Sequence, residues 1–199
     1  MRAHITKIGH VGIGVRDLAR SISFYTEVLG FRLTEQFEYP AQENVGHGGL
    51  VTAGAFVRCN TTHHCLSIFS YRPGVVDEVA QPQYGLHHIA FEVTSAADLL
   101  KLYREFQDRG LEIVSARKGG PGNQPRFYAP DPDGNLLEFY WNIDDIGWDG
   151  ISREYEPITE IDLVEFDFEA HLEKREQQAA AARERASNVL TPAGDLNAD

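Results

Sequence analysis

The sequence predicts an α+β fold in which two tandem βαβββ modules form one cup, followed by a partly helical C-terminal tail. Three observations predict it. Residues 9–30 and 87–110 share one order of strand, helix and closing glycine. Strand-rich segments follow both repeats, and beyond Trp141 the sequence turns acidic and loses this pattern. Residues 1–141 are therefore expected to form a two-module domain, and residues 142–199 an acidic extension.

Each repeat opens on a short strand that carries a histidine near its start, His10 in the first copy and His88 in the second. A helix N-cap signal, an apolar run at helical spacing and a glycine that can end a helix then follow. The cap and glycine positions are Asp17 and Gly30 in the first copy, and Ser95 and Gly110 in the second. The matching order indicates one duplicated βα unit.

Three strand-like segments follow each predicted helix. They are residues 31–39, 48–59 and 63–71 in module 1, and residues 111–118, 124–131 and 135–141 in module 2. The PDPDG sequence at residues 130–134 predicts a hairpin turn. Module 1 is therefore expected over about residues 5–71, a linker over 72–84, and module 2 over about 85–141.

The C-terminal extension differs from the modules in pattern. Residues 141–162 read as a loop, and residues 167–188 as a polar, alanine-rich helix. An apolar stripe begins at Leu163, whereas residues 173–188 are too polar to pack. A chain ending near Glu173 is therefore expected to stay folded and active.

Composition restricts the partners and the compartment. Of the formal net charge of −12, residues 142–199 carry −10, from fifteen acidic and five basic side chains, which leaves about −2 for residues 1–141. Without a basic stripe, nucleic acid is not expected as a partner. Neither a membrane span nor an apolar signal region is present, so a cytoplasmic protein is expected. Cys59 and Cys65 are expected to be reduced packing residues.

Strand alternation separates candidate metal ligands from bystanders. His10 shares a strand face with Gly12 and Gly14, where small residues leave room in front of the sheet. His88 holds the matching position in module 2, and Glu138 is an acid within an otherwise apolar strand. A buried acid needs a partner or a metal.

Two histidines at equivalent places in duplicated modules, together with one acid, make a two-histidine, one-carboxylate set. His10, His88 and Glu138 are therefore predicted to hold one divalent metal per chain in the cup. Such a set fills one face of an octahedron and leaves positions for substrate and dioxygen, which favours Fe(II). Mn(II), Zn(II) and Ni(II) are the alternatives.

Four segments resemble the vicinal oxygen chelate superfamily, which includes glyoxalase I, fosfomycin-resistance proteins, bleomycin-binding proteins and type I extradiol dioxygenases. They are GHVGIGV, FYTEVLGF, HHIAFEV and FYAPDPDGNLLEFYW, and the resemblance covers residues 5–141, about 70% of the chain. The ten-residue step from Tyr128 to Glu138 is similar to the type I extradiol dioxygenase signature. The resemblance implies the same metal ligands, His10, His88 and Glu138.

The same resemblance implies two further active-site residues. A histidine that assists the oxygen chemistry would be His64 or, less favoured, His63. Tyr128 matches a tyrosine that hydrogen-bonds near the substrate.

One position departs from the family pattern. The family has a further histidine nine residues before the tyrosine, where this chain has Gly119. Either another donor such as Lys118 or Asn123 substitutes for it, or the chemistry differs from ring cleavage. If only the donor is missing, Gly119→His is expected to keep or raise the rate.

The resemblance implies an Fe(II)-dependent extradiol-type dioxygenase that opens a catechol-like aromatic next to its diol, with dioxygen as the second substrate. The alternative is a metal-dependent lyase, isomerase or hydrolase that uses Mn, Zn or Ni. Glyoxalase I itself is disfavoured, because matching CLSIF to LLEFY puts Ser67 at its fourth ligand. A small-molecule-binding resistance protein would lack the metal ligands. A homo-oligomer is compatible with this interpretation, and the sequence does not specify the substrate.

Overall fold

The computed structural model describes residues 8–38, 51–71, 86–120, 122–144 and 156–190. The chain divides into two compact units, each with its own sheet. The first unit comprises Met1–His88 and Pro130–Leu136, and the second comprises Ile89–Ala129 and Leu137–Asp199. The βαβββ order occurs twice, so the predicted α+β class is confirmed. The predicted linker, residues 72–84, lies outside the described residues.

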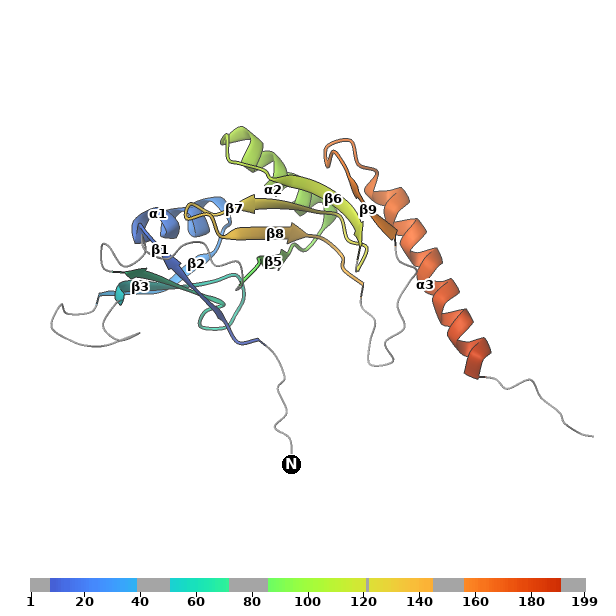
Figure 1. Ribbon diagram of the computed structural model, residues 1–199, viewed down its shortest axis with the longest axis horizontal. Coiled ribbons are helices and arrows are strands. Elements are labelled where there is room, and N and C mark those ends of the chain that lie inside the picture. The colour runs from blue at the N-terminus through green and yellow to red at the C-terminus, as the bar shows by residue number, and fades with distance from the viewer. Residues whose placement is uncertain (1–7, 39–50, 72–85, 121, 145–155, 191–199) are drawn as a thin grey trace, which may run out of the picture. The chain divides into compact units, whose positions relative to one another are not determined.

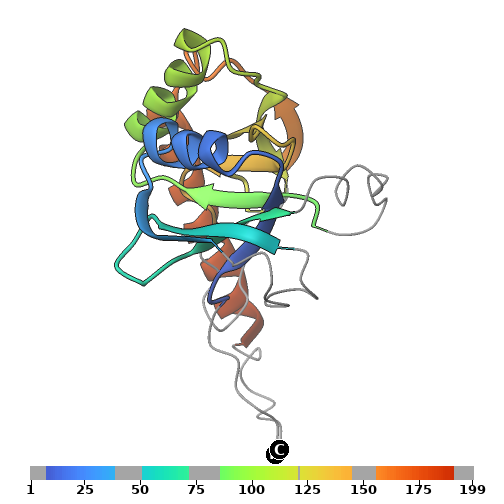
Figure 2. The same cartoon turned by 90° about the vertical axis from the view of Figure 1, so that its left-hand side faces the viewer.

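The described residues of the first unit form one sheet and one helical segment. Its elements are β1 (Val11–Val15), α1 (Leu18–Ser23), the π-helix η1 (Phe24–Val28), β2 (Arg32–Glu38), β3 (Val51–Arg58) and β4 (Leu66–Tyr71). The strand order is β1-β4-β3-β2, with β1 parallel to β4 and the other pairs antiparallel. The helical segment covers one face of this sheet (Figure 1 and Figure 2).

The predicted signals start and end this helical segment. Asp17 caps α1, because its Oδ1 accepts a 3.0 Å hydrogen bond from the backbone N–H of Arg20. Gly30 has a φ of +71°, a left-handed conformation that glycine adopts at little cost. Between them Tyr25 is fully buried, and its hydroxyl donates to Oδ2 of Asp131 at 2.9 Å.

In the second unit, the residues that the structure describes form five strands and two helices. Its elements are β5 (Ile89–Glu92), α2 (Ala96–Asp108), β6 (Ser115–Gly120), β7 (Arg126–Pro130), β8 (Leu136–Tyr140), β9 (Glu156–Glu160) and α3 (Phe168–Leu190). The strand order is β5-β8-β7-β6-β9, with β5 parallel to β8. The buried ring of Phe106 packs α2 on this sheet, 5.5 Å from the ring of Phe127 and 5.7 Å from that of Phe139.

The predicted PDPDG turn joins β7 to β8 and belongs to the first unit. Oδ1 of Asp133 accepts a 2.8 Å hydrogen bond from the backbone N–H of Arg16, and Oδ2 accepts one of 2.9 Å from the hydroxyl of Ser21. Gly134 adopts a φ of +87° in the turn. The two aspartates of this turn therefore bind the start of α1 and the buried Tyr25.

β9 is a strand in a segment that was expected to be a loop, so that expectation is wrong for residues 156–160. It pairs antiparallel with β6 at the edge of the sheet, with Arg117 opposite Glu160. Figure 1 shows β9 beside β6. An edge strand needs backbone partners on one side only, so Pro157 and polar side chains are tolerated there.

Helix α3 packs more extensively than its composition suggested. His171 and Arg175, one helical turn apart, are only 7% and 6% exposed. Arg175 donates a hydrogen bond to the backbone oxygen of Asn142 and lies 3.1 Å from Oδ1 of Asp144. The expectation that residues 173–188 are too polar to pack is therefore wrong, because a buried arginine packs through its ion pair. Among the described residues, no helix is long and apolar enough to cross a membrane.

Candidate functional site

The rings of His10 and His64 lie beside each other in the first unit. His10 directly precedes β1, and His64 lies two residues before β4. Because these strands run parallel with Val11 opposite Leu66, the residues that precede them lie at the same end of the sheet. The two ring centroids are 4.5 Å apart, with the planes tilted by 48°. The strand register thus brings two of the predicted site residues together.

His64 is held between an aromatic ring and imidazole neighbours. Phe56 of β3 stacks on it with a centroid distance of 4.5 Å. Nδ1 of His63 lies 2.9 Å from Nδ1 of His64, and Nε2 of His63 lies 3.5 Å from Glu35. Burial, and then the charges of His10 and His63, lower the pKa of His64 below its ordinary value. At neutral pH the ring is therefore uncharged and able to accept a proton.

His88 occupies in the second repeat the position that His10 occupies in the first. It directly precedes β5, as His10 directly precedes β1. Its side chain is half-buried, and its Nδ1 lies 2.7 Å from Nδ1 of His87. One of these two nitrogens must carry the proton and the other accept it, so the contact couples the tautomers of the two rings.

Glu138 lies in a buried polar network of the second unit. The hydroxyl of Tyr128 donates to its Oε2 at 2.9 Å, and the side-chain amide of Gln124 donates to its Oε1 at 3.4 Å. Nε of Arg126 lies 3.6 Å from Oε1, and both charged side chains are only 6% exposed. The acid thus has the partner that its strand position required. Because Arg126 compensates the charge, burial of Glu138 alone does not demand a metal.

Arg126 and Gln124 are site residues that the sequence interpretation missed. Nη1 of Arg126 donates to the backbone oxygens of Gly119 and Gln124 at 2.8 and 3.0 Å, and Nε donates to the hydroxyl of Tyr128 at 3.1 Å. Burial, and then the hydrogen bond to Glu138, raise the pKa of Tyr128, so its hydroxyl remains a donor. The available signal was an arginine two residues from Tyr128 in a buried strand, and hence on the same face.

The last strands of the two modules, β4 and β8, carry different residues at equivalent positions. Ala90 is opposite Glu138 in the second module, and Gly12 is opposite Ser67 in the first. Gly12 and Ala90 each follow the histidine of their module by two residues, so Ser67 is the counterpart of Glu138. Ser67 is buried, and its hydroxyl has no hydrogen-bond partner among the described residues. The first module therefore offers no carboxylate here.

The three predicted metal ligands are divided between the two units. His10 and His88 belong to the first unit, and Glu138 belongs to the second. Within the part of the chain that the structure describes, no group of three or more His, Cys, Asp or Glu side chains could hold a metal ion. The donor types, two imidazoles and one carboxylate, suit a divalent transition metal. The shared ligand set stays a prediction that rests on donor chemistry and on equivalent positions in the repeats.

The packing of β9 explains why Gly119 carries no histidine. Its φ is +83°, and a Cβ added here would overlap the backbone oxygen of Pro157. Of the two candidate replacement donors, Lys118 lies 3.8 Å from Glu156, and Oδ1 of Asn123 accepts a 3.4 Å hydrogen bond from the backbone N–H of Glu156. Both side chains therefore contact Glu156 of the C-terminal extension. The expectation that Gly119→His keeps or raises the rate disagrees with this packing.

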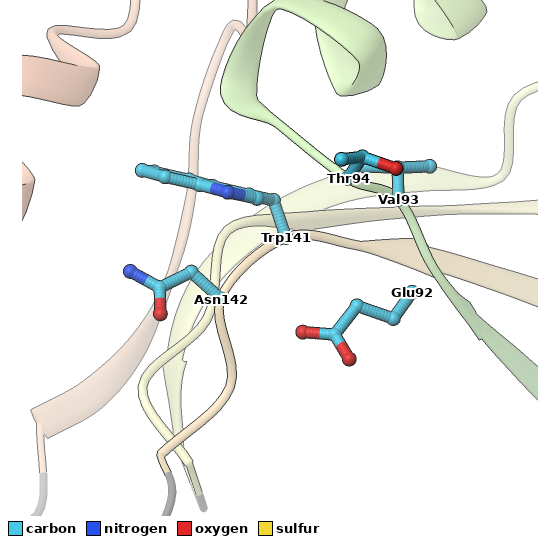
Figure 3. A pocket seen from close by; sticks show the side chains of 5 residues that line it. All are labelled: Glu92, Val93, Thr94, Trp141 and Asn142. Carbon is cyan, nitrogen blue, oxygen red and sulfur yellow. The ribbon is translucent and has the colours of Figure 1, made fainter.

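A pocket opens at the carboxyl ends of β5 and β8 in the second unit (Figure 3). It is lined by Glu92, Val93, Thr94, Trp141 and Asn142. In Figure 3 the Glu92 carboxylate and the Asn142 side chain lie on the same side of the Trp141 indole. Glu92 is opposite Tyr140, and burial followed by the charges of Glu92 and Glu138 raises the pKa of that tyrosine. The pocket therefore lies at the carboxyl end of β8, the strand that carries Glu138, and of its neighbour β5.

Residues 7–139 match the family model of the Glyoxalase/Bleomycin resistance protein/Dioxygenase superfamily. The chain is similar to 3-methylcatechol 2,3-dioxygenase of Pseudomonas putida, with 26% identity over 139 residues that cover 70% of this chain and 43% of the relative. It is also similar to lactoylglutathione lyase of Salmonella typhimurium, with 31% identity over 136 residues. These cover 65% of this chain and 87% of that relative. The chain spans less than half the length of the first curated dioxygenases that it matches.

Solved structures share the fold. One is a glyoxylase/bleomycin resistance protein/dioxygenase domain from Frankia sp. EAN1pec, which matches with a TM-score of 0.54 and 22% identity. The match covers 70% of this chain and 99% of that domain, so the two share the same fold over this part of the chain.

Proposed function

Because the chain belongs to the Glyoxalase/Bleomycin resistance protein/Dioxygenase superfamily, we propose that it is an Fe(II)-dependent, extradiol-type dioxygenase that opens the ring of a catechol-like aromatic. One observation carries the proposal within this family. Ser67 stands where the second module has Glu138, so the repeats offer two histidines and a single carboxylate. That set leaves coordination positions for a chelating diol and for dioxygen, whereas a fourth protein ligand would occupy one of them.

His10, His88 and Glu138 are the residues that would hold the iron. When bound, ferrous iron would supply dioxygen activation beside a chelated catechol. The chain's own contribution is to fix the carboxylate. The Tyr128 hydrogen bond and the Arg126 guanidinium hold Glu138 in one orientation and stabilise its negative charge.

His64 would handle the substrate proton. Its ring lies 4.5 Å from that of His10, and Phe56 stacks on it. An uncharged imidazole beside a metal ligand can accept a proton from a substrate hydroxyl and return it later. His64 therefore suits the role better than His63, whose Nε2 lies against Glu35.

Anaerobic reconstitution with Fe(II) tests the proposal, with iron content and oxygen uptake measured on a panel of catechols. We expect one iron per chain, one dioxygen consumed per ring, and a yellow semialdehyde product of cleavage next to the diol. Replacing His10, His88 or Glu138 with Ala should remove iron and activity together. His64→Ala should keep iron and lose activity. Ser67→Ala is the matched control that should keep both.

Two results would overturn the assignment. Full iron occupancy in Glu138→Ala would exclude Glu138 from the ligand set. The dioxygenase proposal fails if the ferrous protein consumes no oxygen with any catechol and yet transforms a substrate under argon.

That second outcome belongs to the alternative function, a metal-dependent lyase or isomerase that uses Mn(II), Zn(II) or Ni(II). The similarity to lactoylglutathione lyase favours this alternative, because that relative is 31% identical to this chain and the match covers 87% of its length. Ser67 argues against it, since a serine cannot supply the carboxylate that the resemblance to glyoxalase I requires at this position. Activity with Ni(II) or Zn(II) in the absence of oxygen would identify this alternative.

A further inference from the structure

Two free cysteines lie in contact at the ends of the loop that carries His63 and His64. Cys59 directly follows β3 and is exposed, and Cys65 directly precedes β4 and is half-buried. Their Sγ atoms are 3.4 Å apart. The expectation of reduced thiols agrees with the structure, but Cys59 is too exposed to be a packing residue.

Hydrogen bonds of the loop itself hold the two thiols in place. The backbone N–H of Cys65 donates to the oxygen of Val57 at 3.0 Å, which extends the β3–β4 pairing towards the thiols. Within the loop, Oδ1 of Asn60 accepts hydrogen bonds from the backbone N–H of Thr62 at 3.0 Å and from its hydroxyl at 2.6 Å. The contact between the sulfurs is therefore part of an ordered hairpin end.

We propose that Cys59 and Cys65 are a redox modification site, which a peroxide converts to an intramolecular disulfide. Sulfur atoms in a disulfide are about 2.05 Å apart, so the observed pair needs to close by only about 1.4 Å. One thiol first reduces hydrogen peroxide, which forms a sulfenic acid and releases water. The other thiol then attacks the sulfenic sulfur, which forms the S–S bond and releases a second water. Two thiols thus lose two electrons, and one peroxide gains them.

Proximity rather than acidity makes this pair reactive. Burial, and then the hydrogen bond between the two sulfurs, raise the pKa of Cys59 to about 11. The Cys59 thiolate is therefore scarce at neutral pH, and its reaction with peroxide is slow there. The second step joins two groups that already touch, so a sulfenic acid formed on either sulfur is consumed before further oxidation.

The disulfide would close a ring around His63 and His64. The ring of His64 contacts both His10 and Phe56, so locking the two ends of its loop restricts how this side chain can move. An effect on turnover rests on the proposed function. The disulfide itself does not, because it requires neither metal nor substrate.

The test is peroxide treatment of the reduced full-length chain, followed by a free-thiol count and non-reducing peptide mapping by mass spectrometry. We expect both thiols to disappear together, with the loss of two hydrogens and one internal crosslink, and dithiothreitol to restore both. The single variants Cys59→Ser and Cys65→Ser should form no internal crosslink and should accumulate sulfenic acid that dimedone traps.

Two results would overturn the proposal. One is sulfinic acid or an intermolecular dimer in the wild-type chain in place of the internal crosslink. The other is equal dimedone labelling of the wild-type chain and both variants. Circular dichroism of each variant before treatment establishes that the comparison is made on folded protein. Since the readout is thiol chemistry, failure of the dioxygenase proposal would leave this result unchanged.

Discussion

The hydroxyl of Tyr128 donates a 2.9 Å hydrogen bond to Oε2 of Glu138, from one strand of the second sheet to its neighbour. The other carboxylate oxygen faces Arg126 at 3.6 Å. Tyr128 therefore acts on the carboxylate directly. Any influence on a bound substrate adds to its role in orienting Glu138.

Tyr128→Phe should lower the free energy of unfolding by about 1.5–3 kcal/mol, because it removes a hydrogen bond to a buried charged acceptor. If Glu138 binds iron, the loss of this supporting contact should also weaken iron affinity about tenfold or more. Urea unfolding and iron titration measure the two effects. Tyr103→Phe, on α2 and away from Glu138, is the control. An unfolding free energy equal to that of the control would contradict the network.

Gly119→Ala should destabilise the protein more than Gly110→Ala. Both glycines have positive φ, +83° and +64°, so both variants carry a similar backbone cost. Only at Gly119 does the new Cβ also overlap Pro157 of β9, whereas nothing lies within 4 Å at Gly110. We expect an additional loss of about 1–3 kcal/mol for this overpacking. Urea unfolding of the two variants checks it, and equal values would mean that β9 does not pack on Gly119.

The repeat made both sheets predictable, because buried strands show their alternation in the sequence. β9 could not be found in this way. Its segment contains Pro157 and acidic residues, and at the edge of a sheet only its backbone makes the pairing. Gly119, which packs against β9, was equally hard to interpret from the sequence. Its missing histidine was visible in the sequence, but the strand that excludes a side chain there was not.

The partners of the predicted site residues could be predicted only in part, for a similar reason. Module equivalence correctly matched Ser67 to Glu138, since the strand register repeats. The partners of Glu138 depend on which side chains of β7 meet β8, and an arginine in a strand gives no indication of its partner. Arg126 was therefore missed, although Tyr128 on the same face was identified through the family resemblance.

Arg175→Met should lower the free energy of unfolding by about 3–5 kcal/mol, because it removes one member of the largely buried ion pair between Arg175 and Asp144. Arg183→Met is the matched control, since this arginine is exposed on the same helix. We expect the control to change stability by less than about 0.5 kcal/mol. A chain ending near Glu173 lacks Arg175 and should lose stability likewise. Thermal unfolding of the three proteins measures these effects, and equal stability of both arginine variants would contradict the packing of α3.

Glu156 should make the attachment of α3 sensitive to acid. Its Oε1 lies 2.8 Å from Nζ of Lys174 and accepts a 2.9 Å hydrogen bond from Gln178, both on α3. Burial alone would raise the pKa of Glu156, but these hydrogen bonds and the charges of Lys174 and Lys118 lower it below its ordinary value. A carboxyl group whose pKa is lower in the folded than in the unfolded state stabilises the protein at pH values above the unfolded-state pKa. This stabilisation is lost as the pH falls through the folded-state pKa.

The measurement is urea unfolding of the wild-type chain and of Glu156→Gln, from neutral pH down to a pH below the ordinary pKa of a glutamate. At neutral pH the variant should be less stable by about 1–2 kcal/mol, because it loses charge-assisted hydrogen bonds to α3. The difference should shrink as the pH falls below the ordinary value for a glutamate, since the wild-type carboxylate then becomes neutral as well. Glu160→Gln, on the same strand but with an 81% exposed side chain, is the control and should follow the wild-type curve. A stability difference that stays constant over the whole pH range would mean that the charge of Glu156 does not hold α3.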